Sequence, residues 1–157
     1  MTNLTQAEID ERTALLKRFR SLLEQQRAKF REYLKVLESQ EKTIVAEDTE
    51  SLLAHTELEQ QIASNIISLQ KVIKPIEVMC NDTFSGVPDL GEIPQLQADL
   101  QNLQQQVLDR NKKNRDLLQV HIGQLKDRLS SMKNPYRNAR SVYAQSSGVA
   151  TRINISI

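Results

Sequence analysis

The chain has 157 residues, of which 21 are basic and 20 acidic, 39% are hydrophobic and 4% aromatic, with only four glycines and four prolines. This length fits one domain, and so few turn-forming residues argue against a β-sandwich or barrel. The balanced charge excludes a global field that would steer the chain to nucleic acid or to a membrane surface. Residue types that favour helix dominate the composition, so we expect an all-α protein.

The first helix is expected at about residues 5–45. Thr5 and Glu8 have the spacing of a capping box, in which each residue satisfies a backbone N–H of the other. Apolar residues then recur every seven positions, as in a coiled-coil seam. The seam consists of Ile9, Leu16, Leu23, Phe30, Leu37 and Ile44, with Phe19 and Tyr33 at complementary positions and Gln26 and Gln40 as polar members.

The second helix is expected at about 48–78, with Asp48 as its N-cap. Its seam consists of Leu52, Ile62, Ile66, Leu69, Ile73 and Ile76. Pro75 removes a backbone donor, so we expect a kink or an end there. Residues 79–94 hold two glycines and two prolines, which predicts a loop.

The third helix is expected at about 94–132. Its apolar positions are Leu96, Leu100, Leu103, Val107, Leu118, Leu125, Leu129 and Met132. The pair Asn134-Pro135 should stop it, leaving 133–157 as a flexible basic tail without an acidic residue. Each helix has one apolar stripe, so the simplest assembly is an antiparallel bundle of three long, coiled-coil-like helices over residues 1–132.

Residues that often carry chemistry are isolated in this chain. His55 and His121 fall in seven-residue series with helix seams, which indicates polar fillers, since no third metal ligand lies near them. Cys80 lacks a CxxC or nearby histidine partner, and no phosphate-loop, nucleophile-elbow or zinc-protease motif occurs. We therefore expect no enzyme activity, no metal and no cofactor.

The sequence also bears on compartment. A single cysteine agrees with a reducing environment. The first residues lack a basic stretch followed by an apolar one, so we expect no signal peptide. No apolar run approaches the roughly 20 residues of a membrane span. We expect a soluble, cytoplasmic protein without membrane insertion.

A basic run in the third helix consists of Arg110, Lys112, Lys113 and Arg115. A solvated helix face explains it better than nucleic-acid binding, because no aromatic residues are interleaved for base stacking.

Two asparagines interrupt the third seam. Asn111 and Asn114 are compatible with a register-fixing role inside a bundle, and equally with binding the backbone of a guest helix or strand. Tyr143 lies in the tail, where it has no core to join. A tyrosine there is a good anchor for a partner's pocket, although Tyr136 shows that such residues also occur incidentally.

These features resemble a known family. Asn111-x-x-Asn114-x-x-Leu117-Leu118, a helix continuing to Met132 and then Val142-Tyr143 with a following glycine are similar to the FlgN-type flagellar export chaperones. The matching motifs cover about residues 107–157. The glycine stands five positions after the tyrosine, at Gly148, which alters the tail spacing of the family pattern.

The resemblance implies a cytoplasmic chaperone for flagellar type III export. Its partners would be the C-terminal helical segments of FlgK- and FlgL-like hook–filament junction proteins and the cytoplasmic domain of an FlhA-like export gate. By motif match Tyr143 is the gate-docking residue. The residues on the substrate side are Asn111, Asn114, Leu117, Leu118 and Leu125.

Two other classes compete with this interpretation. The seam of the first helix alone would suit a structural coiled-coil adaptor or scaffold, and it is also compatible with a homodimer. A nucleic-acid-binding helical protein would rest on the basic run and the tail arginines, and would show salt-dependent affinity.

Overall fold

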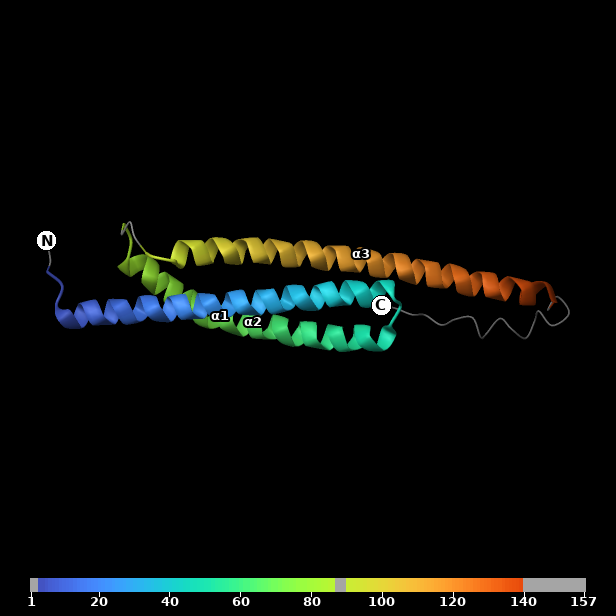
Figure 1. The fold of residues 1–157 in the computed structure, drawn as a ribbon, viewed down its shortest axis with the longest axis horizontal. Coiled ribbons are helices and arrows are strands. Elements are labelled where there is room, and N and C mark those ends of the chain that lie inside the picture. The colour runs from blue at the N-terminus through green and yellow to red at the C-terminus, as the bar shows by residue number, and fades with distance from the viewer. Residues whose placement is uncertain (1–2, 87–89, 140–157) are drawn as a thin grey trace. The chain divides into compact units, whose positions relative to one another are not determined.

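A computed structural model of the chain describes residues 3–86 and 90–139, with side chains described as far as residue 132. The described residues form three long helices, α1 (Gln6–Val45), α2 (Thr49–Thr83) and α3 (Ile93–Ala139) (Figure 1). The predicted all-α architecture of three antiparallel helices is thereby confirmed. The chain divides into two compact units, residues 1–117 and residues 118–157.

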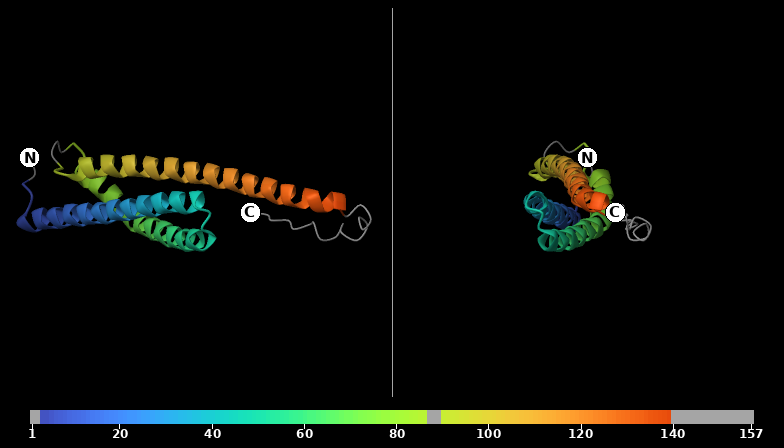
Figure 2. Two further views of the ribbon diagram at one scale, coloured as in Figure 1. Left: turned by 45° about the vertical axis from the view of Figure 1, so that its right-hand side comes forward. Right: turned by 90° about the vertical axis from the view of Figure 1, so that its right-hand side faces the viewer.

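Side-chain caps set the ends of the α1–α2 hairpin, whose helices lie side by side in Figure 2. The Thr5 hydroxyl accepts from the Glu8 N–H at 3.3 Å, and the Glu8 carboxylate accepts from the Thr5 N–H at 2.7 Å, which confirms the capping box. Asp48 caps α2, as predicted, by accepting from the Ser51 N–H at 3.2 Å. Between the helices Glu47 adopts a φ of 56°, so the chain reverses in a short left-handed turn.

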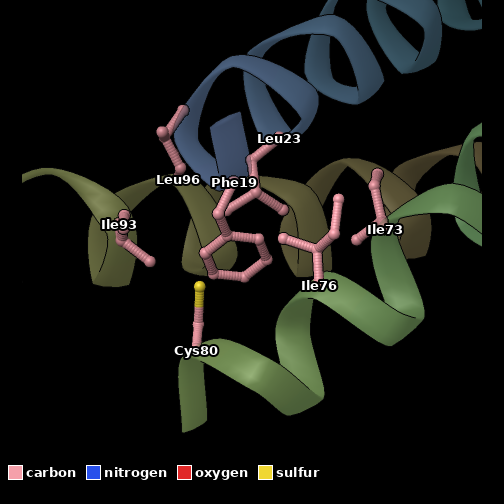
Figure 3. Close-up of a cluster of buried hydrophobic side chains, with 7 residues drawn as sticks. All are labelled: Phe19, Leu23, Ile73, Ile76, Cys80, Ile93 and Leu96. Carbon is pink, nitrogen blue, oxygen red and sulfur yellow. The ribbon is translucent and has the colours of Figure 1, made fainter. Parts of the chain in front are cut away.

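Two clusters of buried side chains form the core of residues 1–117, and each draws on all three helices. The first consists of Phe19, Leu23, Ile73, Ile76, Cys80, Ile93 and Leu96 (Figure 3). The second consists of Phe30, Tyr33, Val36, Leu37, Ile62, Ile66 and Val107. Burying one large apolar side chain stabilises a fold by about 1.5–3 kcal/mol, so these two clusters hold the three helices together.

The predicted seam of α1 is confirmed over most of its length. Buried positions run from Phe19 to Ile44 and include both glutamines, Gln26 and Gln40. Ile9 is 43% exposed, so the buried seam begins later than the heptad pattern predicts.

The helix α2 is longer than predicted. It passes through Pro75 without ending and continues to Thr83, so the predicted loop at 79–94 is reduced to the residues between α2 and α3. Ile73 and Ile76 flank the proline and are both buried, as is Cys80 one turn on. Their packing offsets the one hydrogen bond that the proline removes.

The helix α3 also extends beyond its predicted end at 132. It runs through Asn134-Pro135 to Ala139. Proline removes one backbone donor and disfavours, without forbidding, a helical residue before it. Residues 133–139, which the sequence assigned to the tail, thus belong to α3, and residues 140–157 lie outside the described residues.

Candidate functional site

One of the two polar interruptions of the α3 seam, Asn114, lies inside the bundle. Asn114 is only 2% exposed. Its Nδ2 donates to the backbone carbonyl of Leu37 at 2.8 Å and to Oε1 of Gln40 at 3.0 Å. Both amide hydrogens are therefore used on α1, and α3 is tied to α1 at one axial position.

A hydrogen-bonded network continues from this contact to α2. Gln40 donates through Nε2 to a Glu59 carboxylate oxygen at 3.1 Å, and the Tyr33 hydroxyl donates to the other oxygen at 2.8 Å. Burial, with the hydrogen bond to Glu59, raises the pKa of Tyr33 above its usual range. Asn114, Gln40 and Glu59 thus link α3, α1 and α2 in one chain of polar contacts.

This network specifies alignment more than it adds stability. The Oδ1 of Asn114 is buried and has no hydrogen-bond partner among the described residues. An unsatisfied buried acceptor costs about 1–3 kcal/mol, which offsets much of the gain from the two bonds that Asn114 donates. A polar seam residue that bonds in only one register fixes that register, so the geometry favours the structural interpretation of Asn114.

Ion pairs reinforce the alignment on the surface. Arg110 lies 3.0 Å from Glu41 and 3.8 Å from Glu38, and the Lys113 ammonium lies 2.9 Å from Glu41. The hydrogen bond from Lys113, with the nearby Arg110 charge, lowers the pKa of Glu41. Two cations of the basic run therefore face acids of α1, as a bundle role requires.

A further ion pair joins α1 to the first half of α3. The Arg27 guanidinium donates to Asp99 at 3.1 Å, with both side chains about one-third exposed. Together with the Asn114 contacts, this pair fastens α3 to α1 between Asp99 and Asn114.

The other residues that the sequence singles out fall in different environments. Asn111 and Leu117 are half-buried on α3 within residues 1–117. Leu118 is half-buried and Leu125 is 50% exposed in the second unit. Tyr143 lies outside the described residues.

Residues 118–132 of α3 carry an apolar stripe that is largely exposed. We call it the open seam; it consists of Leu118, Ile122, Leu125, Leu129 and Met132. Successive spacings of four and three residues place the five side chains on one helix face. Ile122 is half-buried, whereas Leu129 is 48% and Met132 67% exposed, and none of the five belongs to the two core clusters.

Sequence reasoning assigned no site role to Ile122, Leu129 or Glu59. The signal for Ile122 and Leu129 was present, because they complete an unbroken four-three series with Leu118, Leu125 and Met132. Glu59 gave no signal, since a glutamate on an amphipathic helix usually marks the solvent face.

The histidines and the cysteine have structural surroundings. His55 is half-buried with its Nδ1 3.4 Å from the Thr43 hydroxyl, and His121 makes an interaction within the chain. Cys80 is buried in the first cluster, where burial raises the pKa of its thiol and disfavours the reactive thiolate.

Within residues 3–86 and 90–139, no group of three or more His, Cys, Asp or Glu side chains could hold a metal ion. In the same part of the chain, none of the three helices combines the length and apolar character that crossing a membrane requires.

Fold and site together define an all-α protein with a polar-networked three-helix core and an exposed apolar helix face. No protein-family model and no solved structure matches the chain. It is 38% identical over 141 residues to a Treponema pallidum (strain Nichols) protein described as uncharacterized, a match that covers 90% of this chain and 87% of that protein. The chain belongs to the same family as this treponemal protein.

Proposed function

We propose that the protein is a cytoplasmic chaperone for flagellar type III export. It binds the C-terminal helical segments of FlgK- and FlgL-like junction proteins and delivers them to an FlhA-like export gate. The observation that carries this proposal is the open seam, a coiled-coil-like face with no place in either core cluster. Such a face is suited to holding an amphipathic guest helix.

The open seam has enough apolar surface for a guest of useful affinity. Full burial of one aliphatic side chain contributes about 1.5–3 kcal/mol, and association costs about 4–15 kcal/mol in lost freedom. Five seam side chains together with their counterparts on the guest exceed the lower part of that cost. A reversible complex results, as a carrier that must release its cargo requires.

The substrate-side residues divide between two roles. Leu118 and Leu125 belong to the open seam and contact the guest. Asn114 serves the guest indirectly, because it aligns the bundle through Leu37 and Gln40. Asn111 and Leu117, half-buried beside it, remain candidate contacts at the start of the guest-binding stretch.

A matched pair of exposed aliphatic residues tests guest binding. Leu125, in the seam, is 50% exposed, and Val120, on the opposite side of the helix, is 54% exposed. Leu125→Asp should weaken binding of FlgK- and FlgL-like C-terminal segments at least about 100-fold, because it buries an unpaired charge. Val120→Asp should change the affinity by less than about threefold. Titration calorimetry with purified segments measures both, and equal effects of the two variants would move the guest site elsewhere.

Tyr143 supplies the test of gate docking. Tyr143→Ala should weaken binding of the chaperone–substrate complex to an FlhA-like cytoplasmic domain, since truncating a hot-spot aromatic costs about 2 kcal/mol or more. Tyr136→Ala is the control and should have a smaller effect. Substrate affinity should be unchanged in both variants. An equal loss from the two substitutions contradicts the assignment of Tyr143 as the docking residue.

A structural coiled-coil adaptor without an export role is the alternative, and the same exposed seam favours it. The two functions differ in their second partner. An adaptor has no affinity for the export-gate domain, whereas the proposed chaperone binds that domain when loaded with substrate. Co-purification from cell lysate, with identification of the bound proteins, distinguishes them.

A further inference from the structure

The open seam follows the strict spacing of a coiled coil. In heptad terms Ile122 and Leu129 occupy a positions, while Leu118, Leu125 and Met132 occupy d positions. At 100° per residue these five positions span about 80° of the helix circumference. Such a narrow stripe is typical of a helix that pairs with another helix.

A membrane surface fits this stripe less well. Helices that lie on a bilayer have a wide apolar face and commonly carry tryptophan or phenylalanine in it. Residues 118–139 contain neither amino acid. Val120, the remaining exposed aliphatic residue of residues 118–132, lies on the other side of the helix from the seam.

The positions flanking the seam are basic or neutral. The e positions hold Gln119 and Lys126, and the g positions hold His121 and Arg128. Asp127 takes the outward f position, so no acidic side chain flanks the seam in residues 118–132. Lys126 and Arg128 therefore give the seam a basic rim.

The basic rim belongs to a wider division of charge along the chain. Residues 118–157 contain six basic side chains and one acidic one, a net charge of +5. Residues 1–117 contain 15 basic and 19 acidic side chains, a net charge of −4. The near-neutral total thus conceals a distinctly basic second unit.

A second copy of the same seam would be a poor partner. In a parallel pair, g positions face e positions of the other helix, and in an antiparallel pair g faces g and e faces e. Either arrangement sets Lys126 and Arg128 against basic or neutral positions of the other copy and never against an acidic one. Like charges at such positions oppose pairing, whereas glutamate or aspartate at the partner's flanks would attract.

From this geometry we infer that the open seam selects an amphipathic helix with an apolar a/d stripe and acidic residues at its flanking e and g positions. The inference rests on the proposed function and deepens it, because it states the charge pattern of the guest. The apolar stripe supplies most of the affinity, and the rim supplies the choice between guests of similar hydrophobicity.

Two synthetic helices test this inference on the full-length protein. Both are 28-residue peptides with the same Leu/Ile stripe; one carries Glu at every flanking position and the other carries Lys. Fluorescence anisotropy in about 50 mM salt should show the acidic peptide binding roughly tenfold or more tightly, since several exposed charge pairs contribute together. The difference should shrink in about 1 M salt, where the Debye length falls to about 3 Å.

Charge reversal on the protein completes the test. Lys126→Glu should reduce the preference for the acidic peptide several-fold. Lys112→Glu is the matched control, because it makes the same charge change at an exposed lysine outside residues 118–132 and should leave the preference unchanged. Both variants are expected to retain wild-type helicity.

Several outcomes would overturn the inference. Equal binding of the two peptides, or a preference for the basic one, removes the charge rule while leaving export of FlgK- or FlgL-like segments intact. Sedimentation that shows a dimer dissociated by Leu125→Asp would assign the seam to a second copy. Binding to anionic phosphatidylglycerol vesicles without binding to either peptide would assign it to a membrane. Conversely, acidic-peptide preference without any affinity for junction-protein segments supports the inference and contradicts the export role.

Discussion

The buried asparagine at the centre of the bundle gives a quantitative prediction. Asn114 donates two hydrogen bonds, each of which contributes about 1 kcal/mol net. Asn114→Ala removes both and leaves Oε1 of Gln40 without this donor, while it also removes the unsatisfied Oδ1. Because removal of Oδ1 offsets part of the loss of the two bonds, the free energy of unfolding should fall by only about 1 kcal/mol.

Asn114→Asp should cost more than the alanine substitution at neutral pH. The introduced carboxylate has no hydrogen to donate, and it faces the Leu37 carbonyl and the Gln40 side-chain oxygen. Burying an ion against two acceptors adds several kcal/mol in principle, so a total loss of about 4 kcal/mol or more is expected. Most small domains are stable by only about 5–15 kcal/mol, so the effect is large.

The pH dependence of Asn114→Asp has a definite sign. Burial and the facing acceptors raise the pKa of the introduced carboxyl in the folded state above its unfolded value of about 3.9. The extra loss is therefore complete above the folded pKa and shrinks as pH falls through it, because the protonated form can again donate one hydrogen bond.

Urea unfolding followed by circular dichroism at 222 nm, at pH 8 and pH 5, measures these losses against wild type at each pH. Asn111→Asp, at a half-buried position in the same helix, is the control and should cost under about 1 kcal/mol. The reasoning is refuted if Asn114→Asp costs no more than Asn114→Ala at pH 8, or if its deficit does not narrow at pH 5.

Three further predictions concern the same unit. Tyr33→Phe should lower the free energy of unfolding by about 1.5–3 kcal/mol, because it deletes a hydrogen bond to the Glu59 carboxylate. Because the pKa of Tyr33 is raised in the folded state, its contribution to the free energy of unfolding is complete below a pH of about 10 and is lost as the pH rises through the folded pKa. Urea titrations in which the stability of wild type and variant falls equally above a pH of about 10 would contradict this. Pro75→Ala should raise the free energy of unfolding by about 1–3 kcal/mol, because it restores a backbone donor inside α2, and a lower urea midpoint would show that the proline is needed there. Arg27→Ala should cost about 0.5–1 kcal/mol at low salt and less at 1 M salt through loss of its pairing with Asp99, and a salt-independent cost would point to packing instead.

Much of the bundle could be predicted from periodicity and capping. A seven-residue repeat encodes one buried face, and Leu23, Phe30 and Leu37 are buried where it places them. Thr5 and Asp48 cap their helices because the hydrogen bonds involved are local and depend on residues within one turn.

The ends of α2 and α3 were less predictable. A proline in the sequence indicates a local free-energy cost to the helix, but whether the helix ends there also depends on the packing around the proline. At Pro75 that packing is visible, since Ile73 and Ile76 are buried on either side. Sequence alone shows the cost without the compensation.

The role of Asn114 could not be settled from sequence for a related reason. A seam asparagine can bond within its own bundle or bind a guest helix, and the sequence spacing is the same in both cases. The structural role of Asn114 follows from the position of Leu37 and Gln40 opposite its side chain, and that position depends on the axial alignment of α1 against α3. The same alignment brings Glu59 to Tyr33, which no local pattern indicates.

The basic rim of the open seam has two consequences under the proposed function. An exposed leucine-rich seam tends to pair with another copy of itself, which would remove it from use. Lys126 and Arg128 oppose that pairing and, by the same charges, attract an acidic guest. Both effects arise from exposed charges, so salt weakens them over the same concentration range. Rising ionic strength should therefore promote self-association over the same range in which it abolishes the preference for acidic helices, a coupling that neither a constitutive scaffold nor a membrane-bound helix would show.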